Sequence, residues 1–158
     1  MIFARHALVS MALILWSGPG WSDWDAAGAA AQCLGGQSFI VLPVLRELRG
    51  RGWKHIVLSN HVPELPRLTE ALGLSSFLID VYCSGRTGAE KPHPKAFEPV
   101  FADHPEARAG WMIGDSWRAD VQGAMAVGMR SILVREKHPG ALLQCDRLYD
   151  IAEIVGGA

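Results

Sequence analysis

The sequence is poor in the patterns that mark disulfide-bonded, zinc-binding or nucleic-acid-binding proteins. Its three cysteines, Cys33, Cys83 and Cys145, are far apart and form no CxxC pair, so a reduced, cytoplasmic setting is the simpler interpretation. The six histidines form no HExxH motif and no grouping with cysteine, which argues against a zinc site. With 15 basic and 16 acidic residues and no block of either sign, the chain shows no nucleic-acid-binding pattern.

No apolar stretch is long enough to cross a membrane. The run Ala7–Trp16 falls short of the about 20 residues that a transmembrane helix needs. The chain does have enough hydrophobic sequence for a core, since 49% of its 158 residues are hydrophobic. This length predicts one domain.

Residues 110–134 carry the clearest structural pattern, that of a βαβ unit in a parallel sheet. In such sheets, the loop at the carboxyl end of a strand faces the ligand crevice. Asp115 therefore sits where a metal ion or a phosphate would bind, and Asp120 follows in the first turns of the helix behind it. In order, the pattern consists of the apolar run Trp111–Ile113, the turn Gly114–Ser116, a helical stretch from about Trp117 to Val127, the stop Gly128 and the apolar run Ser131–Val134.

A single carboxylate at this place has an ordinary explanation, because an Asp in the first turn stabilises a helix. Two carboxylates that flank Ser116 are harder to explain in this way, since one cap accounts for only one of them. Asp115 suits a hard cation such as Mg²⁺, which binds one or two protein carboxylates together with phosphate oxygens.

The rest of the chain alternates predicted helices and strands, as expected for an α/β protein. Ser59 and Asn60 stand at the carboxyl end of a predicted strand whose near-continuous apolar sequence is typical of a parallel strand covered on both faces. Lys91 lies in a loop stiffened by prolines. The predicted helices are Val41–Arg51, Val62–Leu72, Lys95–Phe101 and Ile151–Val155, and the predicted strands are Trp53–Leu58, Phe77–Tyr82 and, more weakly, Arg147–Tyr149.

Three stretches of this sequence resemble motifs of one family. The pattern G-D-S-x-x-x-D after an apolar strand resembles the fourth motif of the haloacid dehalogenase-like (HAD) hydrolases, which are mostly Mg²⁺-dependent phosphatases. His55–Asn60 is similar to the second motif of that family and Glu90–Phe97 to the third, in the same order. The resemblance covers about Val41 to the C-terminus. It implies a HAD-like Rossmannoid parallel sheet flanked by helices, with residues 37–158 as the core that carries motifs two to four.

The resemblance also implies roles for individual side chains, with Mg²⁺ as the cofactor and a small phosphorylated molecule as the substrate. Ser59 would donate its hydroxyl to the phosphate, and Asn60 would contact the substrate. Lys91 would bind a phosphate oxygen or a neighbouring carboxylate. Asp115 would be the metal ligand, and Asp120 would orient Lys91 or a metal-bound water. Lys91 and Asp120 are therefore the predicted catalytic residues.

Each of these residues also has a structural explanation. Ser59 and Asn60 fit an ordinary strand end or helix cap, and Lys91 fits a solvated surface lysine. Lys95 is the competing lysine, but the family's third motif places its lysine directly before the first proline. His61, which follows Asn60, is assigned no role.

The family's first motif, a strand followed by D-x-D-x-[TS], is not found. In the family, the first Asp of this motif attacks phosphorus, the second acts as general acid and base, and both lie on the central strand. A D-x-D does occur at Asp23 and Asp25, but Ser22 with Asp25 forms a capping-box-like pair that opens an Ala-rich helix. We therefore interpret both as helix-start residues. The central, nucleophile-bearing strand is expected to be missing.

Residues 1–36 allow two interpretations. By resemblance, they are what remains of a helical cap domain, with Met1–Trp16 as a buried helix. The alternative is a secretory signal over residues 1–31, because a basic residue precedes the run Ala7–Trp16 and Ala29–Ala31 imitates a cleavage region.

Two functional hypotheses follow. The first is an N-terminally truncated HAD-like hydrolase for phosphate monoesters, weakly active or inactive as given. The second is a non-catalytic protein that binds phosphate and Mg²⁺ or depends on a partner for the missing strand. Unpaired sheet edges at that position favour association, including homo-oligomers. The substrate is not identified by the sequence, and dehalogenases of the same family are not distinguished from phosphatases.

Overall fold

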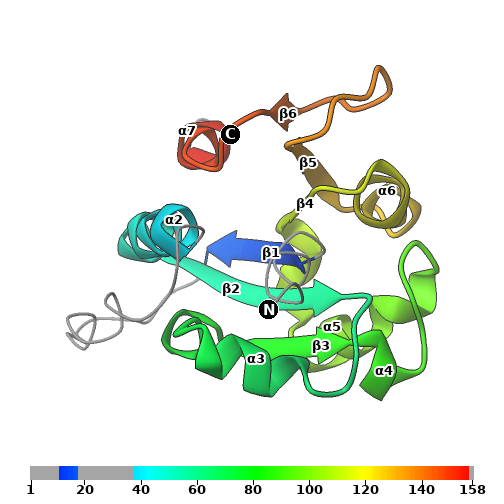
Figure 1. The fold of residues 1–158 in the computed structure, drawn as a ribbon. Coiled ribbons are helices and arrows are strands. Elements are labelled where there is room, and N and C mark those ends of the chain that lie inside the picture. The colour runs from blue at the N-terminus through cyan, green and yellow to red at the C-terminus, as the bar shows by residue number, and fades with distance from the viewer. Residues whose placement is uncertain (1–10, 18–37, 157–158) are drawn as a thin grey trace.

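The computed structural model describes residues 11–17 and 38–156, which form helices packed on one mixed sheet (Figure 1). In the described part, the strands follow the spatial order β3-β2-β1-β4-β5-β6. Their bounds are Met11–Ser17 for β1, Trp53–Ser59 for β2, Asp80–Cys83 for β3, Trp111–Gly114 for β4, Arg130–Val134 for β5 and Gln144–Cys145 for β6.

The helices cover both faces of this sheet. Their bounds are Ser38–Gly50 for α2, Leu65–Ala71 for α3, Ser84–Thr87 for α4, Glu98–Asp103 for α5, Gly123–Ala126 for α6 and Asp150–Gly156 for α7. Short helical turns lie between them: η2 (Ser75–Phe77), η3 (Pro94–Ala96), η4 (Pro105–Ala109) and the π-helical turn η5 (Trp117–Gln122). None of the described helices is long and apolar enough to cross a membrane.

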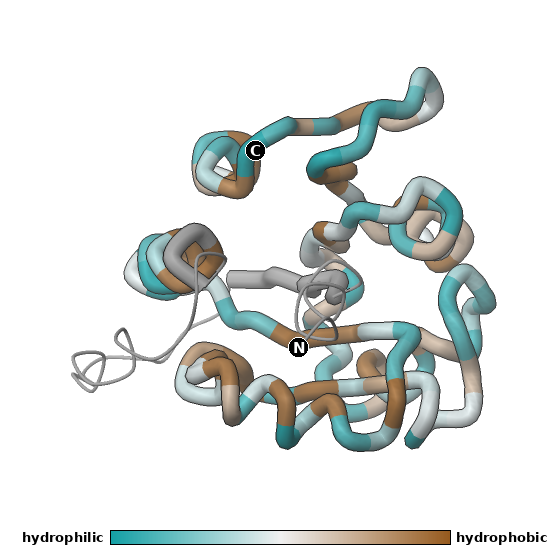
Figure 2. Tube along the Cα trace, in the orientation of Figure 1, coloured by the Kyte–Doolittle hydropathy of each residue, from teal (hydrophilic) through white to brown (hydrophobic). Residues whose placement is uncertain are grey.

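The strands place alternate side chains on opposite faces, so hydrophobic clusters form on both sides of the sheet. In β4, Trp111 and Ile113 pack with residues of α2, β5 and α7, whereas Met112 packs on the other side with residues of α5 and α6. Figure 2 shows that α2 and α7 each carry a hydrophobic and a hydrophilic side, as helices that cover a sheet do. The result is the α/β architecture that the alternating sequence pattern predicts.

Most predicted elements are confirmed, with shifted bounds. The predicted helix Val41–Arg51 is α2, and the predicted strand Trp53–Leu58 is β2. The weak strand predicted at Arg147–Tyr149 is wrong, because the last strand is the two-residue β6 three residues earlier. That strand is too short and too polar to give an alternating pattern.

The main departure is β1, which lies in the middle of the sheet and runs antiparallel to both neighbours. Met11 pairs with Ser59 of β2, and Leu13 pairs with Ile113 of β4. The helix predicted over Met1–Trp16 is therefore wrong for residues 11–16. A short apolar run does not distinguish a buried strand from a buried helix.

The centre of the sheet is thus occupied, so the unpaired edges expected there are not formed. The occupant differs from the strand that the family resemblance implies, because it runs in the opposite direction and contains no Asp. Asp23 and Asp25 lie outside the described residues. The assignment of residues 1–36 to a cap remnant, or to a signal peptide, stays a prediction.

Candidate functional site

The carboxyl ends of β2, β4 and β5 meet at one edge of the sheet. Because β1 is antiparallel to both β2 and β4, these two strands run in the same direction, and β5 is parallel to β4. Ser59, Asp115 and Arg135 stand at or directly after the ends of these strands. The ends of parallel strands form the ligand crevice in open α/β sheets.

Lys91 lies in the loop between α4 and η3 and connects the end of β2 with η5, the helical turn that follows β4. Its Nζ lies 2.7 Å from Oδ1 of Asp120, and the two side chains are only 1% and 3% exposed. The same Nζ donates a hydrogen bond to the main-chain carbonyl of Leu58, the residue before Ser59. Burial lowers the pKa of Lys91, and the charge of Asp120 opposes this effect. Lys91 is therefore a buried, paired cation and not a solvated surface lysine.

Asn60 fixes the main chain of the Lys91 loop. Its side-chain Nδ2 donates to the carbonyl of Lys91 at 2.8 Å, and its Oδ1 accepts from the N–H of Lys91 at 2.8 Å. The amide group is thus engaged on both sides. This geometry favours a positioning role for Asn60 over the predicted contact with substrate.

Asp120 is held from the turn that follows β4. Its Oδ2 accepts a hydrogen bond from the N–H of Ser116 at 3.0 Å, and the hydroxyl of Ser116 accepts from the N–H of Ala119 at 3.1 Å. A Cβ on Gly114 would lie 2.2 Å from Oδ2 of Asp120. Gly114 is thus required by the close approach of the buried carboxylate to the backbone.

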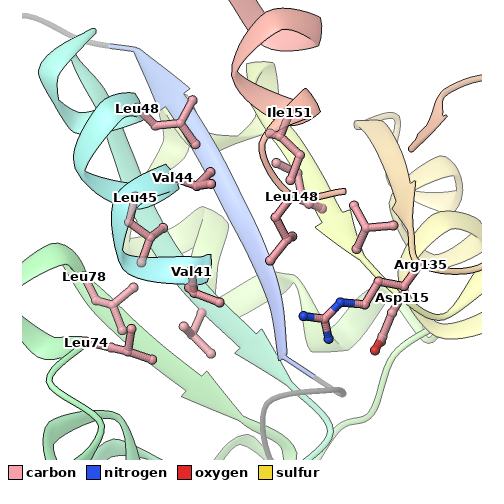
Figure 3. Close-up of a pocket in the computed structure, with 13 residues that line it drawn as sticks. Val41, Val44, Leu45, Leu48, Leu74, Leu78, Asp115, Arg135, Leu148 and Ile151 are labelled. Carbon is pink, nitrogen blue, oxygen red and sulfur yellow. The ribbon is translucent and has the colours of Figure 1, made fainter. Parts of the chain in front are cut away.

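Asp115 is half-buried, and nearby positive charges offset only part of the effect of burial on its carboxyl group. Burial, reinforced by the nearby charge of Asp120, raises its pKa to about 6, whereas Arg135 and Lys91 act to lower it. Arg135 and Asp115 both line one end of a mostly apolar cavity of about 60 Å³ between α2 and α7 (Figure 3). A cation near Asp115 would stabilise the charged form of this carboxyl group.

Asp115 fits one position of a Mg²⁺ site, because Mg²⁺ takes few protein carboxylates and keeps several waters. Among the described residues, no group of three or more His, Cys, Asp and Glu side chains could hold a metal ion. A Mg²⁺ ion at Asp115 would need further oxygen ligands from backbone, water or a phosphate.

The described carboxylates at this edge, Asp115 and Asp120, both come from the segment that follows β4. The end of β1 that lies beside Ser59 is Met11, and no Asp or Glu occurs from Met1 to Met11. Asp23 and Asp25 lie outside the described residues, so the expected absence of a nucleophile stays a prediction.

Two features of the site were not predicted from the sequence. Arg135 has a positive φ of 64°, which is uncommon for a residue other than glycine. Trp117 stacks on His138, with ring centroids 3.9 Å apart and 12° between planes, so the loop after β5 packs on the turn after Asp115. The signal for Arg135 was its place directly after an apolar strand. The stacking of Trp117 on His138 joins two loops, and no sequence pattern links them.

The fold and this edge define a Rossmannoid α/β protein with a buried Lys–Asp pair and a carboxylate at its crevice. A family model for HAD-hydrolase-like proteins matches residues 88–143. The haloacid dehalogenase-like hydrolase domain-containing protein 3 of Bos taurus is 40% identical over 96 residues, covering 60% of this chain and 38% of that protein. The glyceraldehyde 3-phosphate phosphatase of Pyrococcus abyssi is 32% identical over 92 residues, covering 56% of this chain and 38% of that protein.

Solved structures agree. A HAD phosphatase from Thermococcus onnurineus has a TM-score of 0.68 and 27% identity, covering 75% of this chain and 57% of that one. A magnesium-bound protein from Bacillus subtilis, described as a HAD-hydrolase, has a TM-score of 0.66 and 23% identity over 73% of this chain and 53% of that one, a likeness of fold alone. The chain belongs to the haloacid dehalogenase-like superfamily. It spans about two fifths of the length of the curated relatives it matches.

Proposed function

We propose that this chain carries the phosphate- and Mg²⁺-binding part of a HAD-like phosphoric monoester hydrolase. Ser59 and Lys91 hold the phosphate, Asp115 binds the metal, and Asp120 positions Lys91. The observation that carries the proposal is the contact of Lys91 with both Asp120 and the carbonyl of Leu58. This contact joins the second, third and fourth motifs at one sheet edge.

The residues of the chain divide the work in a simple way. Asp120 and the Leu58 carbonyl fix the ammonium of Lys91, and Asn60 fixes its main chain, so the cation is held in place before a ligand binds. A preorganised cation costs no reorganisation when an anion arrives. A Mg²⁺ ion bound at Asp115 would neutralise negative charge on phosphate oxygens.

The class of substrate follows from the relatives. Relatives of this chain are named as phosphatases for glyceraldehyde 3-phosphate and for ribulose 1,5-bisphosphate. We infer a small phosphorylated substrate on this ground.

We infer a cytoplasmic location because Cys83 and Cys145 are free thiols. Homo-oligomers would form through the outer strands β3 and β6 of the described sheet. Size-exclusion chromatography with light scattering would detect them.

A second function is favoured by β1. The antiparallel strand places Met11, and no carboxylate, beside Ser59. This arrangement suits a protein that binds phosphate and Mg²⁺ without turnover, or one that receives its nucleophile from elsewhere. An upstream, in-frame DNA sequence that encodes an apolar strand followed by D-x-D-x-[TS] would favour the hydrolase.

Calorimetric titration with MgCl₂, and then with inorganic phosphate in excess Mg²⁺, tests the binding function. Asp115→Asn is expected to weaken Mg²⁺ binding by about tenfold or more, the range seen when residues supporting a metal are lost. Glu106→Gln, an exposed carboxylate change on η4, is the matched control and should leave the affinity unchanged. Absence of both Mg²⁺ and phosphate binding by the wild-type chain would refute the proposal.

Hydrolysis of p-nitrophenyl phosphate separates the two functions. Turnover that disappears in Asp115→Asn supports the hydrolase and places the nucleophile outside the described residues, with Asp23→Asn and Asp25→Asn as the next variants. Binding without turnover supports the second function.

A further inference from the structure

Arg135 has an unusual backbone conformation at the edge of the crevice. Its φ of 64° lies in the left-handed region, which L-residues with a side chain rarely adopt. The main chain is held there because the N–H of Arg135 donates to the carbonyl of Cys145 at 3.1 Å, next to the pairing of Val134 with Cys145. Strained conformations of this kind cluster at ligand sites.

The side chain of Arg135 extends along the same end of the cavity as Asp115 (Figure 3). Both residues line this cavity. Arg135 is solvent-exposed, so its guanidinium is accessible to a ligand. The charge of Arg135 also acts on the Asp115 carboxyl group, lowering its pKa.

A bound anion would lie near the carboxylates of Asp115 and Asp120, so a cation in addition to Lys91 would stabilise it. Lys91 has three N–H donors, and Asp120 and the Leu58 carbonyl engage two of them. A phosphate between Ser59 and Asp115 would meet two carboxylates and one remaining donor of Lys91. A guanidinium has five donors in a planar fork that matches phosphate oxygens.

We propose that Arg135 is an anion-binding residue of this site, and that its guanidinium contacts the phosphate of a ligand bound beside Asp115. The left-handed backbone at position 135 directs the guanidinium to that place. This inference rests on the proposed phosphate-binding function and assigns it a residue that the sequence motifs do not contain.

The test separates binding from stability. Arg135→Gly removes the guanidinium and relieves the left-handed backbone, so it should raise or preserve the melting temperature while weakening the binding of inorganic phosphate by about tenfold, the loss of one charge-assisted contact. Arg135→Lys keeps the charge without the fork and should fall between wild type and Arg135→Gly. Arg67→Ala removes an exposed arginine from α3, away from the crevice, and is the matched control, with an affinity close to that of wild type.

The outcomes distinguish the role of Arg135 from the proposed function. Phosphate binding by Arg135→Gly within about twofold of wild type, or an equal loss in Arg67→Ala, would overturn the role of Arg135. Ser59→Ala distinguishes the two proposals: if it weakens phosphate binding and Arg135→Gly does not, only this inference fails. If neither change matters, or if the wild-type chain does not bind phosphate, the proposed function fails as well.

Discussion

The Nζ of Lys91 lies 2.7 Å from Oδ1 of Asp120, and both side chains are almost fully buried. A pair of this kind is costly to break, because the remaining partner is left as an uncompensated charge away from water. Lys91 lies in a loop and Asp120 in the helical turn η5, so the pair also fixes the third motif against the fourth. Loss of the pair should therefore disturb the arrangement of the whole crevice.

Lys91→Met is therefore expected to lower the free energy of unfolding by about 3–5 kcal/mol, the usual cost of removing one partner of a buried pair. The double variant Lys91→Met with Asp120→Leu should recover part of that loss, since it removes both charges. Urea denaturation of the two variants and of Asp120→Leu measures the coupling. A loss below about 1 kcal/mol for Lys91→Met would mean that the pair is solvated in solution.

Gly114→Ala tests the close approach of Asp120 to the backbone. The added Cβ would meet the carboxylate of Asp120 at about 2.2 Å, so Asp120 must move away from Lys91. We expect a destabilisation of about 1–3 kcal/mol, as for overpacking in a core, together with weaker phosphate binding.

Gly50→Ala is the control for this change. A Cβ at Gly50 meets nothing within 4 Å, and the residue ends helix α2, so the substitution should be neutral or stabilising. Equal melting temperatures for the two alanine variants would contradict the requirement for glycine at position 114.

Asn60→Ala removes both hydrogen bonds to the main chain of Lys91. Two lost hydrogen bonds in a half-buried contact predict a destabilisation of about 1–3 kcal/mol. Because the Lys91 loop is released, amide hydrogen exchange at residues 89–93 should become faster, while exchange in β5 stays the same. Weakened phosphate binding without faster exchange would instead indicate that Asn60 contacts the ligand directly.

His55 makes stability depend on pH. The ring is buried in β2, its Nδ1 lies 3.0 Å from the carbonyl of Phe77, and burial lowers its pKa from 6.5 to about 4. A base with a lowered native pKa binds fewer protons in the folded state than in the unfolded state. Its contribution is therefore complete above pH 6.5 and is lost as the pH falls toward 4.

The difference of 2.5 pKa units corresponds to about 3 kcal/mol. His55→Asn keeps a donor for the Phe77 carbonyl and does not titrate. Between pH 7 and pH 4, the wild-type chain should lose about 3 kcal/mol more stability than this variant, measured by urea denaturation. Parallel stability curves for the two proteins would show that His55 is hydrated in the folded state.

The crevice was predictable from the sequence because its residues follow strands with strong apolar patterns. Asp115 comes directly after β4 and Asn60 directly after β2, and these two strands run in the same direction, so their carboxyl ends lie at one edge of the sheet. Arg135 was missed because its backbone conformation depends on the hydrogen bond to Cys145, which no local pattern encodes. The position of β1 was missed because its partners β2 and β4 come much later in the sequence, so no local pattern encodes the pairing. An apolar run of this length also suits a helix.

The direction of β1 can be tested by cross-linking. The antiparallel register pairs Leu13 with Val57, so cysteines at these two positions of a Cys33→Ser, Cys83→Ser, Cys145→Ser background should form a disulfide on mild oxidation. The control pair is Leu13→Cys with Ile56→Cys, because Ile56 and Val57 point to opposite faces of the sheet. Non-reducing electrophoresis and peptide mass measurement would report the bond. Cross-linking of the control pair but not of the first pair would show that β1 has another register or direction.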